Sequence, residues 1–307
     1  MRTLIIGFGS IGKRHAKVLK ELYPNIDIHL VTSQEINAYK TYSELKKVSN
    51  IDKFDYFIIA SETYKHFPQL KFLENTVENK TILVEKPLFI KKENLKIKKN
   101  NVYVGYNLRF HPIIQEIKNK TKNEKIIYVN AIAGQYLPTW RPERDYRKSY
   151  CATKEKGGGV LLDLSHEIDY IQHLFGKINH IEAKNTKISD LEIDSDDLTT
   201  AIGKTNKGTI INFSIDYISK IPKRSILVHT LHETIIGDLI QNTLCIGLKN
   251  LEKKETKFSC SDRNYTYRKM HEEIIEGRFR DLCTFDEGLE VIDTIDKIRN
   301  SEICKEW

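Results

Sequence analysis

The sequence lacks the cysteine patterns that build metal centres and disulfide frameworks. Its five cysteines are scattered and odd in number, and no two of them form a CxxC pair. They are Cys151, Cys245, Cys260, Cys283 and Cys304. This distribution argues against a zinc site and predicts reduced thiols, as in a cytoplasmic protein. We therefore expect no bound metal.

Long apolar runs and a strong charge bias are missing too. No run approaches the length of a membrane span, and the chain begins with a strand pattern rather than with the charged and apolar regions of a signal peptide. The net charge is +7 on 307 residues. The densest basic run, residues 91–99, predicts a short solvated helix without interleaved aromatic residues. We expect neither a membrane nor a nucleic acid as a partner.

What is present is the pattern of a two-domain α/β protein. Short apolar runs alternate with helical segments up to residue 105, which predicts a doubly wound parallel sheet. Beyond that point strands separated by turns dominate, which predicts a mostly antiparallel sheet. We place a dinucleotide-binding Rossmann domain at 1–107 and a substrate-binding α+β domain at 108–307.

The periodicity places the individual elements. In the first domain, helices are expected at 41–48, 66–73 and 91–98, and strands at 4–6, 26–31, 56–60, 82–84 and 102–105. In the second, helices are expected at 113–118, 160–175, 265–278 and 287–299, and strands at 126–133, 196–204, 209–218, 225–230, 234–237 and 244–248. There is no internal repeat and no low-complexity linker.

A glycine-rich turn follows the first strand. The residues are Gly7, Phe8, Gly9, Ser10, Ile11 and Gly12, and an amphipathic helix follows them. In such a GxGxxG turn the first glycine makes the tight turn, the second lets a pyrophosphate approach the backbone, and the third lets the helix lie close to the strand. Free N–H groups at the helix N-terminus attract the phosphates. We therefore predict that this turn binds a dinucleotide.

The second strand ends without the acidic residue that usually binds the adenosine ribose of NAD. Thr32 and Ser33 stand there instead. Without a carboxylate, a 2′-phosphate is not repelled, and either hydroxyl can donate a hydrogen bond to it. No arginine follows the strand, so NAD stays open, but NADP is favoured.

Two later strand ends lie on the same predicted cofactor edge, because parallel strands end together. One carries Ser61, Glu62 and His66, which we expect to contact the cofactor. The other carries Glu85 and Lys86 before a proline, and both are expected to contact the cofactor as well. A lysine with a lowered pKa can exchange a proton with a substrate hydroxyl, so Lys86 is expected to be functional rather than an ordinary strand exit.

A second chemistry-bearing stretch follows three glycines at 157–159. Asp163, His166, Glu167 and Tyr170 fall at helical spacing and share one face of the predicted helix 160–175. The glycines are expected to supply a flexible start to that helix. The face is either a plain solvent face or part of an active site, and the cofactor fold upstream favours the active site.

The loop 135–148 contains three arginines with Trp140 and two tyrosines. Guanidinium groups such as those of Arg141 and Arg147 match carboxylate or phosphate. The loop is either a surface loop with ordinary salt bridges or a cover over an anionic sugar. Arg141, Arg147 and Trp140 are therefore candidate substrate ligands.

These motifs together resemble those of the Gfo/Idh/MocA oxidoreductase family. The matching residues are Gly7-x-Gly9-x-x-Gly12, Glu85-Lys86-Pro87, Gly105-Tyr-Asn107-x-Arg109-Phe110, and Gly157-Gly158-Gly159 followed by Asp163 and a histidine. The resemblance implies a Rossmann domain, and a second domain whose large open sheet often forms dimers or tetramers. It also implies NAD(P)-dependent oxidation or reduction of a sugar or cyclitol hydroxyl.

The resemblance also assigns roles to residues. Lys86 matches the family's catalytic lysine and Asp163 its helix aspartate, and the Lys86–Pro87 bond is expected to be cis. The family commonly has a histidine four residues after that aspartate, whereas here His166 follows at three and Glu167 stands at four. Either His166 or Glu167 is therefore the partner of Lys86. The proline usual before the helix at His66 is missing as well.

The resulting hypothesis is hydride transfer between nicotinamide and a sugar carbon. Lys86 would move the proton, His166 would assist, and Asp163 would orient the sugar hydroxyls or His166. Tyr106, Asn107 and Arg109 should border the same cleft, and Glu167 should meet the substrate. The loop 135–148 resembles that of relatives in bacterial surface-glycan biosynthesis, so an anionic or nucleotide-linked sugar is favoured. A non-catalytic sensor of cofactor or sugar, and NAD-assisted group transfer without net redox change, are the alternatives.

Overall fold

The computed structural model describes residues 1–259 and 262–301, so Cys260 and Cys304 lie outside the described residues. The chain divides into two compact units, and Met1–Asn107 together with Asn264–Ile292 forms the first. The expected domain of 1–107 thus gains residues 264–292, which the sequence pattern placed in the second domain. They join the first unit because α6 (Tyr265–Ile275) packs on α1 (Ser10–Leu22), and β15 (Cys283–Thr284) pairs with β6 (Asn101–Val104).

The first unit is built on a seven-stranded sheet. Its parallel strands lie in the order β3-β2-β1-β4-β5-β6, the Rossmann order, and β15 adds an antiparallel edge. The strands not yet given are β1 (Arg2–Ile6), β2 (Asp27–Val31), β3 (Lys40–Tyr42), β4 (Tyr56–Ile59) and β5 (Thr81–Val84). Their apolar runs are buried almost completely, as both faces of a parallel sheet are covered. The predicted doubly wound parallel sheet is confirmed.

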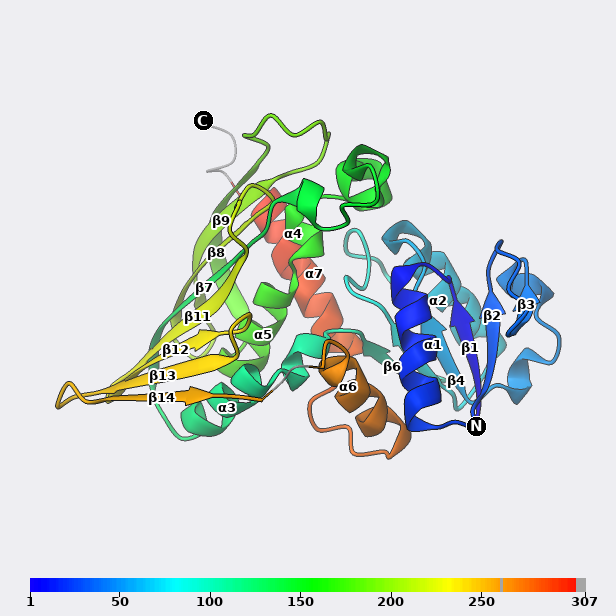
Figure 1. The fold of residues 1–307 in the computed structure, drawn as a ribbon, viewed down its shortest axis with the longest axis horizontal. Coiled ribbons are helices and arrows are strands. Elements are labelled where there is room, and N and C mark those ends of the chain that lie inside the picture. Colours follow the sequence, from blue (N-terminus) through cyan, green and yellow to red (C-terminus); the bar gives the residue numbers. More distant parts are fainter. Residues whose placement is uncertain (260–261, 302–307) are drawn as a thin grey trace. The chain divides into compact units, whose positions relative to one another are not determined.

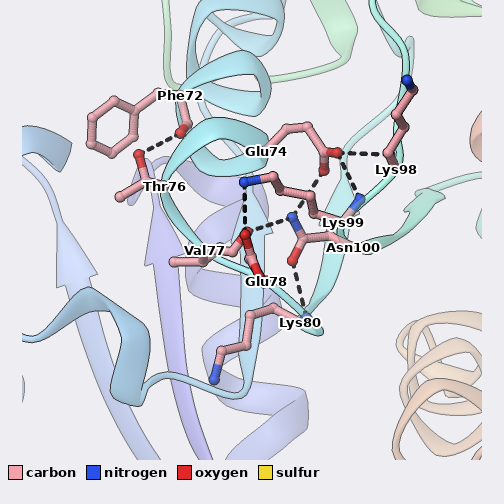
Figure 2. Close-up of polar contacts among 9 residues, drawn as sticks. All are labelled: Phe72, Glu74, Thr76, Val77, Glu78, Lys80, Lys98, Lys99 and Asn100. Carbon is pink, nitrogen blue, oxygen red and sulfur yellow. Dashed lines mark hydrogen bonds and ion pairs between the residues drawn. The ribbon is translucent and has the colours of Figure 1, made fainter.

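Two helices expected in this unit are wrong. Residues 41–48 contain the end of β3, which pairs with β2, and only one 3₁₀ turn, Leu45–Lys47. Residues 91–98 form no helix because their end is anchored to α2 (His66–Thr76) by a buried carboxylate. Figure 2 shows Glu74 accepting hydrogen bonds from the backbone N–H groups of Lys98 and Lys99, and from the Asn100 side chain. These contacts fix the end of the segment without a helix.

The second unit contains an eight-stranded, mostly antiparallel open sheet in the order β14-β13-β12-β11-β7-β10-β9-β8, as predicted. Only β7 and β10 pair in parallel. The strands are β7 (Ile126–Gly134), β8 (Ile178–Thr186), β9 (Leu198–Thr205), β10 (Ile210–Asp216), β11 (Lys223–Thr230), β12 (Glu233–Asp238), β13 (Thr243–Leu248) and β14 (Lys253–Lys257). The edge strands β8 and β14 were not predicted. β14 is exposed throughout, so it has no apolar alternation to reveal it.

Helices cover one face of this sheet (Figure 1). They are α3 (Pro112–Thr121), α4 (Val160–Asp163), α5 (His166–Phe175) and the last turns of α7 (Phe285–Arg299). The single helix expected at 160–175 is wrong, because the backbone leaves the helical region at Leu164, with φ −101° and ψ 30°. Asp163 therefore ends one helix and His166 begins the next. The helical register that was expected to align their side chains is lost.

Candidate functional site

The glycine turn in the first unit has the geometry that a diphosphate requires. Gly7 has φ +94°, and a Cβ there would lie 2.7 Å from the Ser61 backbone. A Cβ on Gly12 would collide with the Gly7 carbonyl oxygen, so α1 lies against the turn only because residue 12 is glycine. A Cβ on Gly9 would meet nothing within 4 Å, which leaves open space over its backbone.

The N-terminus of α1 faces this open space without a competing anion. Gly9 is the N-cap, no side chain caps the helix, and the first turn contains no acidic residue. The N–H groups and the positive end of the helix dipole are thus available to phosphate oxygens. The residues therefore fit a dinucleotide, as the sequence predicts, with Phe8 buried and Ser10 exposed beside the turn.

The end of β2 is tied to the glycine turn. Thr32 Oγ1 accepts a hydrogen bond from the Gln34 backbone at 3.1 Å, and Gln34 Nε2 donates to the Phe8 carbonyl at 3.2 Å. Ser33 is exposed and Thr32 is half-buried. Two hydroxyl groups thus stand where an acidic residue would bind the ribose.

His66 links two strand-end loops. Its ring is 1% exposed, with Nε2 3.1 Å from the Ser61 carbonyl and Nδ1 3.0 Å from the Pro87 carbonyl. Burial lowers its pKa, although these carbonyls act in the opposite direction. Glu62 is exposed and pairs with Lys65. The structure thus shows His66 holding the loops together, while direct contact of these residues with a cofactor stays a prediction.

Lys86 directly follows β5, between a buried carboxylate and a cis peptide bond to Pro87, as expected. The side chain of Lys86 is half-buried, and its backbone N–H donates to Glu85 Oε2 at 3.3 Å. Glu85 Oε1 lies 2.9 Å from His15 Nε2. The lysine is thus attached to a well-anchored turn at the carboxyl edge of the parallel sheet.

In the second unit, Asp163 is buried and held by phenols. Its Oδ1 accepts from the Tyr150 hydroxyl at 3.0 Å, and its Oδ2 accepts from the Tyr217 hydroxyl at 2.6 Å. Burial, and next the Asp163 charge, raise the pKa values of both tyrosines. The pKa of the Cys151 thiol is raised by the same two causes. These groups therefore stay protonated and donate to the carboxylate.

The other residues expected beside Asp163 are buried as well, so the alternative of a plain solvent face is wrong. His166 is 8% exposed, and Glu167 is fully buried and pairs with Arg224 at 2.9 Å. The three glycines before α4 are also packed, since a Cβ on Gly158 would meet the Tyr150 and Cys151 carbonyls. They give the helix a close-packed start rather than a flexible one.

Arg109 and its neighbours are buried too. Arg109 is 2% exposed and forms a bidentate ion pair with Asp169, at 2.7 Å for Nη2 and 3.1 Å for Nε. In the first unit, Tyr106 is 1% exposed, and Asn107 donates to Thr266 Oγ1 at 2.6 Å. The guanidinium is thus already matched by a carboxylate.

The arginines of the loop 135–148 differ from one another. Arg147 pairs with Asp145 and Glu192, at 2.8 and 3.1 Å. Arg141 is half-buried and forms no ion pair within residues 1–259 and 262–301. Trp140 donates to the Gln135 carbonyl and packs edge-on against Tyr217. Arg141 is therefore a half-buried arginine of this loop with charge to offer, and the exposed Arg144 forms no ion pair among the described residues either.

Sequence reasoning missed the partners that anchor these side chains. They are Tyr150, Asp169, Tyr217 and Arg224. Of these four, only Asp169 could have been recognised from neighbouring residues. It is a carboxylate in an otherwise apolar stretch of the predicted helix, two residues after Glu167, and such a group needs a partner when buried. Among the described residues, no cluster of three or more histidine, cysteine or acidic side chains is arranged to bind a metal ion, and no helix is long and apolar enough to span a membrane.

Comparisons with known proteins agree with both units. The model of an oxidoreductase family with an NAD-binding Rossmann fold matches residues 1–100, and that of the GFO/IDH/MocA C-terminal domain matches residues 114–236. No curated protein sequence matches the chain.

Solved structures of similar fold span the whole chain. UDP-N-acetylglucosamine 3-dehydrogenase GnnA from Acidithiobacillus ferrooxidans is 18% identical with a TM-score of 0.78, covering 99% of this chain and 98% of its own. Levoglucosan dehydrogenase in complex with NADH and levoglucosan is 16% identical with a TM-score of 0.83, covering 99% and 97%. An NAD-binding oxidoreductase from Klebsiella pneumoniae is 15% identical with a TM-score of 0.81, covering 100% and 98%. At such identities the likeness shows the fold.

Proposed function

The chain belongs to the GFO/IDH/MocA oxidoreductase family and has an NAD-binding Rossmann domain, and from this premise we propose that it transfers a hydride between a nicotinamide dinucleotide and a sugar carbon. The observation that carries the proposal is the placement of Lys86. It follows β5 at the same sheet edge as the glycine turn after β1, with β4 between them. Two of the similar structures are named as sugar dehydrogenases, which supports a sugar as the substrate class.

The chemistry divides between the cofactor and this chain. The nicotinamide, when bound, accepts or supplies the hydride. In the oxidative direction Lys86, as the free amine, takes the proton of the hydroxyl whose carbon loses hydride. In the reductive direction its ammonium returns that proton to the carbonyl oxygen. The glycine turn and the N-terminus of α1 would hold the diphosphate of that cofactor.

Residues of the second unit are proposed to orient the sugar. Asp163 is fixed by two phenol donors, and its carboxylate is proposed to orient a substrate hydroxyl or His166. Since Glu167 is neutralised by Arg224, His166 is the better candidate for assisting Lys86. Arg109, which is bound to Asp169, is proposed to support the substrate-binding residues of the second unit. Tyr106 and Asn107 are proposed to support the residues of the first unit.

The test of this function is turnover with a reporting cofactor. The protein is incubated with NAD or NADP and a panel of neutral, acidic and nucleotide-linked sugars, and the near-ultraviolet absorbance of reduced nicotinamide is followed. Turnover of any sugar supports the proposal. Binding of cofactor and sugar without turnover would instead identify a sensor, and product formation without an absorbance change would identify group transfer.

We propose NADP as the preferred cofactor, because hydroxyls replace the ribose-binding carboxylate. Thr32→Asp is expected to weaken NADP binding about tenfold or more, since the new carboxylate repels the 2′-phosphate. NAD binding should hold or improve, because the carboxylate accepts from the ribose hydroxyls. Fluorescence titration of both cofactors measures this. Thr32→Asn is the uncharged control, and equal losses for both cofactors in Thr32→Asp would contradict the placement of Thr32.

An anionic sugar is proposed as the substrate, with Arg141 as its ligand. Arg141→Ala is expected to raise KM for anionic substrates about 10- to 100-fold through the loss of a charge-assisted hydrogen bond, and to spare neutral ones. Arg147→Ala is the matched control, because Asp145 and Glu192 already balance Arg147. Steady-state kinetics on a charged and a neutral sugar separates the outcomes. An equal effect on both substrates would remove the idea, and with it the assignment to surface-glycan biosynthesis.

Location and assembly complete the proposal. The described cysteines Cys151, Cys245 and Cys283 form no disulfide bond, which supports a reducing cytoplasm. Isoleucines 127, 202, 210 and 236 of the second-unit sheet are each at least 40% exposed, which supports a homodimer or homotetramer through this sheet. Light scattering would report the molar mass.

A further inference from the structure

Four buried side chains of the first unit form an unbroken hydrogen-bond chain that ends beside Lys86. Glu85 Oε1 lies 2.9 Å from His15 Nε2, and His15 Nδ1 lies 2.9 Å from His271 Nε2. His271 Nδ1 lies 3.1 Å from the Tyr56 hydroxyl. Glu85 is 6% exposed, Tyr56 is 1% exposed, and both histidines are fully buried. The chain joins α1, α6, β4 and the end of β5.

The chemistry of these groups determines which atom donates and which accepts in each hydrogen bond. A carboxylate only accepts, so His15 donates from Nε2. A neutral imidazole that donates at one nitrogen accepts at the other, so His15 Nδ1 accepts from His271 Nε2–H. His271 Nδ1 then accepts from the Tyr56 hydroxyl. Every hydrogen bond is therefore donated toward Glu85, and every nitrogen has a partner.

The surroundings favour this order over charged rings. Burial, and next the neighbouring His15, lower the pKa of His271, while burial and next the Glu85 charge raise the pKa of Tyr56. Besides the members of the chain, the Tyr267 ring faces His15, and the Arg14 guanidinium lies over Tyr267. Burial raises the pKa of Tyr267, so its hydroxyl stays protonated and adds no charge beside His15. The charged group next to this ring is the Arg14 guanidinium.

The row of hydrogen bonds through His15 and His271 determines where the Glu85 carboxylate lies. Its second oxygen, Oε2, accepts from the Lys86 backbone N–H. A Cβ on Gly105 would lie 2.7 Å from Oε1, so the carboxylate occupies space that only glycine leaves free. The two oxygens thus connect the histidine pair to the backbone of the lysine.

We propose that His15 and His271 are positioning residues, which hold the Glu85 carboxylate in place and so fix the Lys86 turn for proton transfer. This inference rests on the proposed function of Lys86 as the proton donor and acceptor. Tyr56 donates the last hydrogen bond of the row, at the end away from Glu85. His271 lies 256 residues from His15 in the sequence. The GxGxxG turn and the Glu-Lys-Pro segment therefore give no indication that His271 supports the Lys86 turn.

The first test determines the tautomers of His15 and His271 in the unmodified protein and does not depend on a measurement of enzyme activity. Long-range ¹H–¹⁵N NMR spectra of ¹⁵N-histidine-labelled protein are recorded around neutral pH, with His15→Gln and His271→Gln spectra for assignment. Both rings are expected to be neutral, with the proton on Nε2 and Nδ1 bare. A proton on Nδ1 of either ring, or a charged ring, would overturn the proposed order.

The second test separates positioning from stability. His15→Leu is expected to lower kcat about 10²-fold, the usual effect of displacing a catalytic group by about 1 Å, while the cofactor Kd is unchanged. His15→Gln keeps an N–H near the position of Nε2 and should restore much of kcat. His29→Gln, at a buried histidine that pairs with Asp27 instead, is the control and should leave kcat unchanged.

The outcomes distinguish this inference from the proposed function. Full kcat in His15→Leu, or a loss that His15→Gln does not recover, would reject the positioning role even if Lys86 is essential. Full activity in a Lys86→Ala variant would reject the proposed role of Lys86, and the NMR result would still report the proton order of the histidine chain.

Discussion

Replacing Lys86 with alanine is expected to lower kcat by about 10²- to 10⁴-fold, the range that a positioned general acid or base contributes. Cofactor binding should hold, because the glycine turn and the N-terminus of α1 are formed by other residues. The side chain is half-buried, so its removal leaves only a small defect in packing. Single-turnover kinetics together with cofactor titration measure the two effects separately.

Lys86→Arg is the matched variant for this experiment. Arginine keeps the positive charge but does not release a proton near neutral pH. If Lys86 moves a proton, arginine should be as inactive as alanine in the oxidative direction. Recovery of activity by arginine would show that only the charge is needed, and wild-type activity in the alanine variant would remove Lys86 from the mechanism.

Acid is expected to destabilise the fold strongly, through buried neutral histidines. Burial lowers the pKa of His111 from 6.5 to about 4, although a backbone hydrogen bond with Leu239 opposes the shift. The unfolded chain therefore binds a proton at this residue below pH 6.5, while the folded chain does not until about pH 4. The stabilisation is fully present above pH 6.5 and is lost as the pH falls toward 4.

The expected loss from His111 alone is on the order of 3 kcal/mol, a large part of a typical folding free energy. His66 and His271 have lowered pKa values for the same main reason, so they add in the same direction. Denaturant unfolding measured between pH 7.5 and 4 tests this, as about 1.4 kcal/mol corresponds to each tenfold change in proton affinity.

His111→Asn provides the control for this pH dependence. His111 caps α3 by accepting from the Ile113 backbone at 3.2 Å, and asparagine can cap in the same way without titrating in this range. The variant should lose stability at pH 7.5 but show a shallower decline toward pH 4. An unchanged slope would assign the acid sensitivity to other groups.

The strands β1, β2, β4, β5 and β6 and the helices α1 and α2 were predictable, because buried parallel strands are short continuous apolar runs and glycines separate the first from its helix. The short strands β3 and β15 were not predicted. The two wrong helices, 41–48 and 91–98, failed for a reason that lies outside their own residues. The first two residues of 41–48 pair with β2 as part of β3, and the end of 91–98 is held outside a helix by the Glu74 carboxylate. Residues 264–292 joined the first unit through contacts with α1 and β6, which no local pattern encodes.

The candidate site shows the same division. Local spacing is enough to identify the glycine turn, the Glu85–Lys86 strand end and Asp163, because each depends on a few adjacent residues. The sequence by itself thus determined the family, the fold class and the chemical groups available for catalysis. Only the tertiary structure decided which of those groups are already engaged: Arg109 by Asp169, Glu167 by Arg224, and His15 by His271. The physical reason is that burying a charged or hydrogen-bonding group requires a partner, and that partner comes from whichever segment packs against it, however far away in the chain.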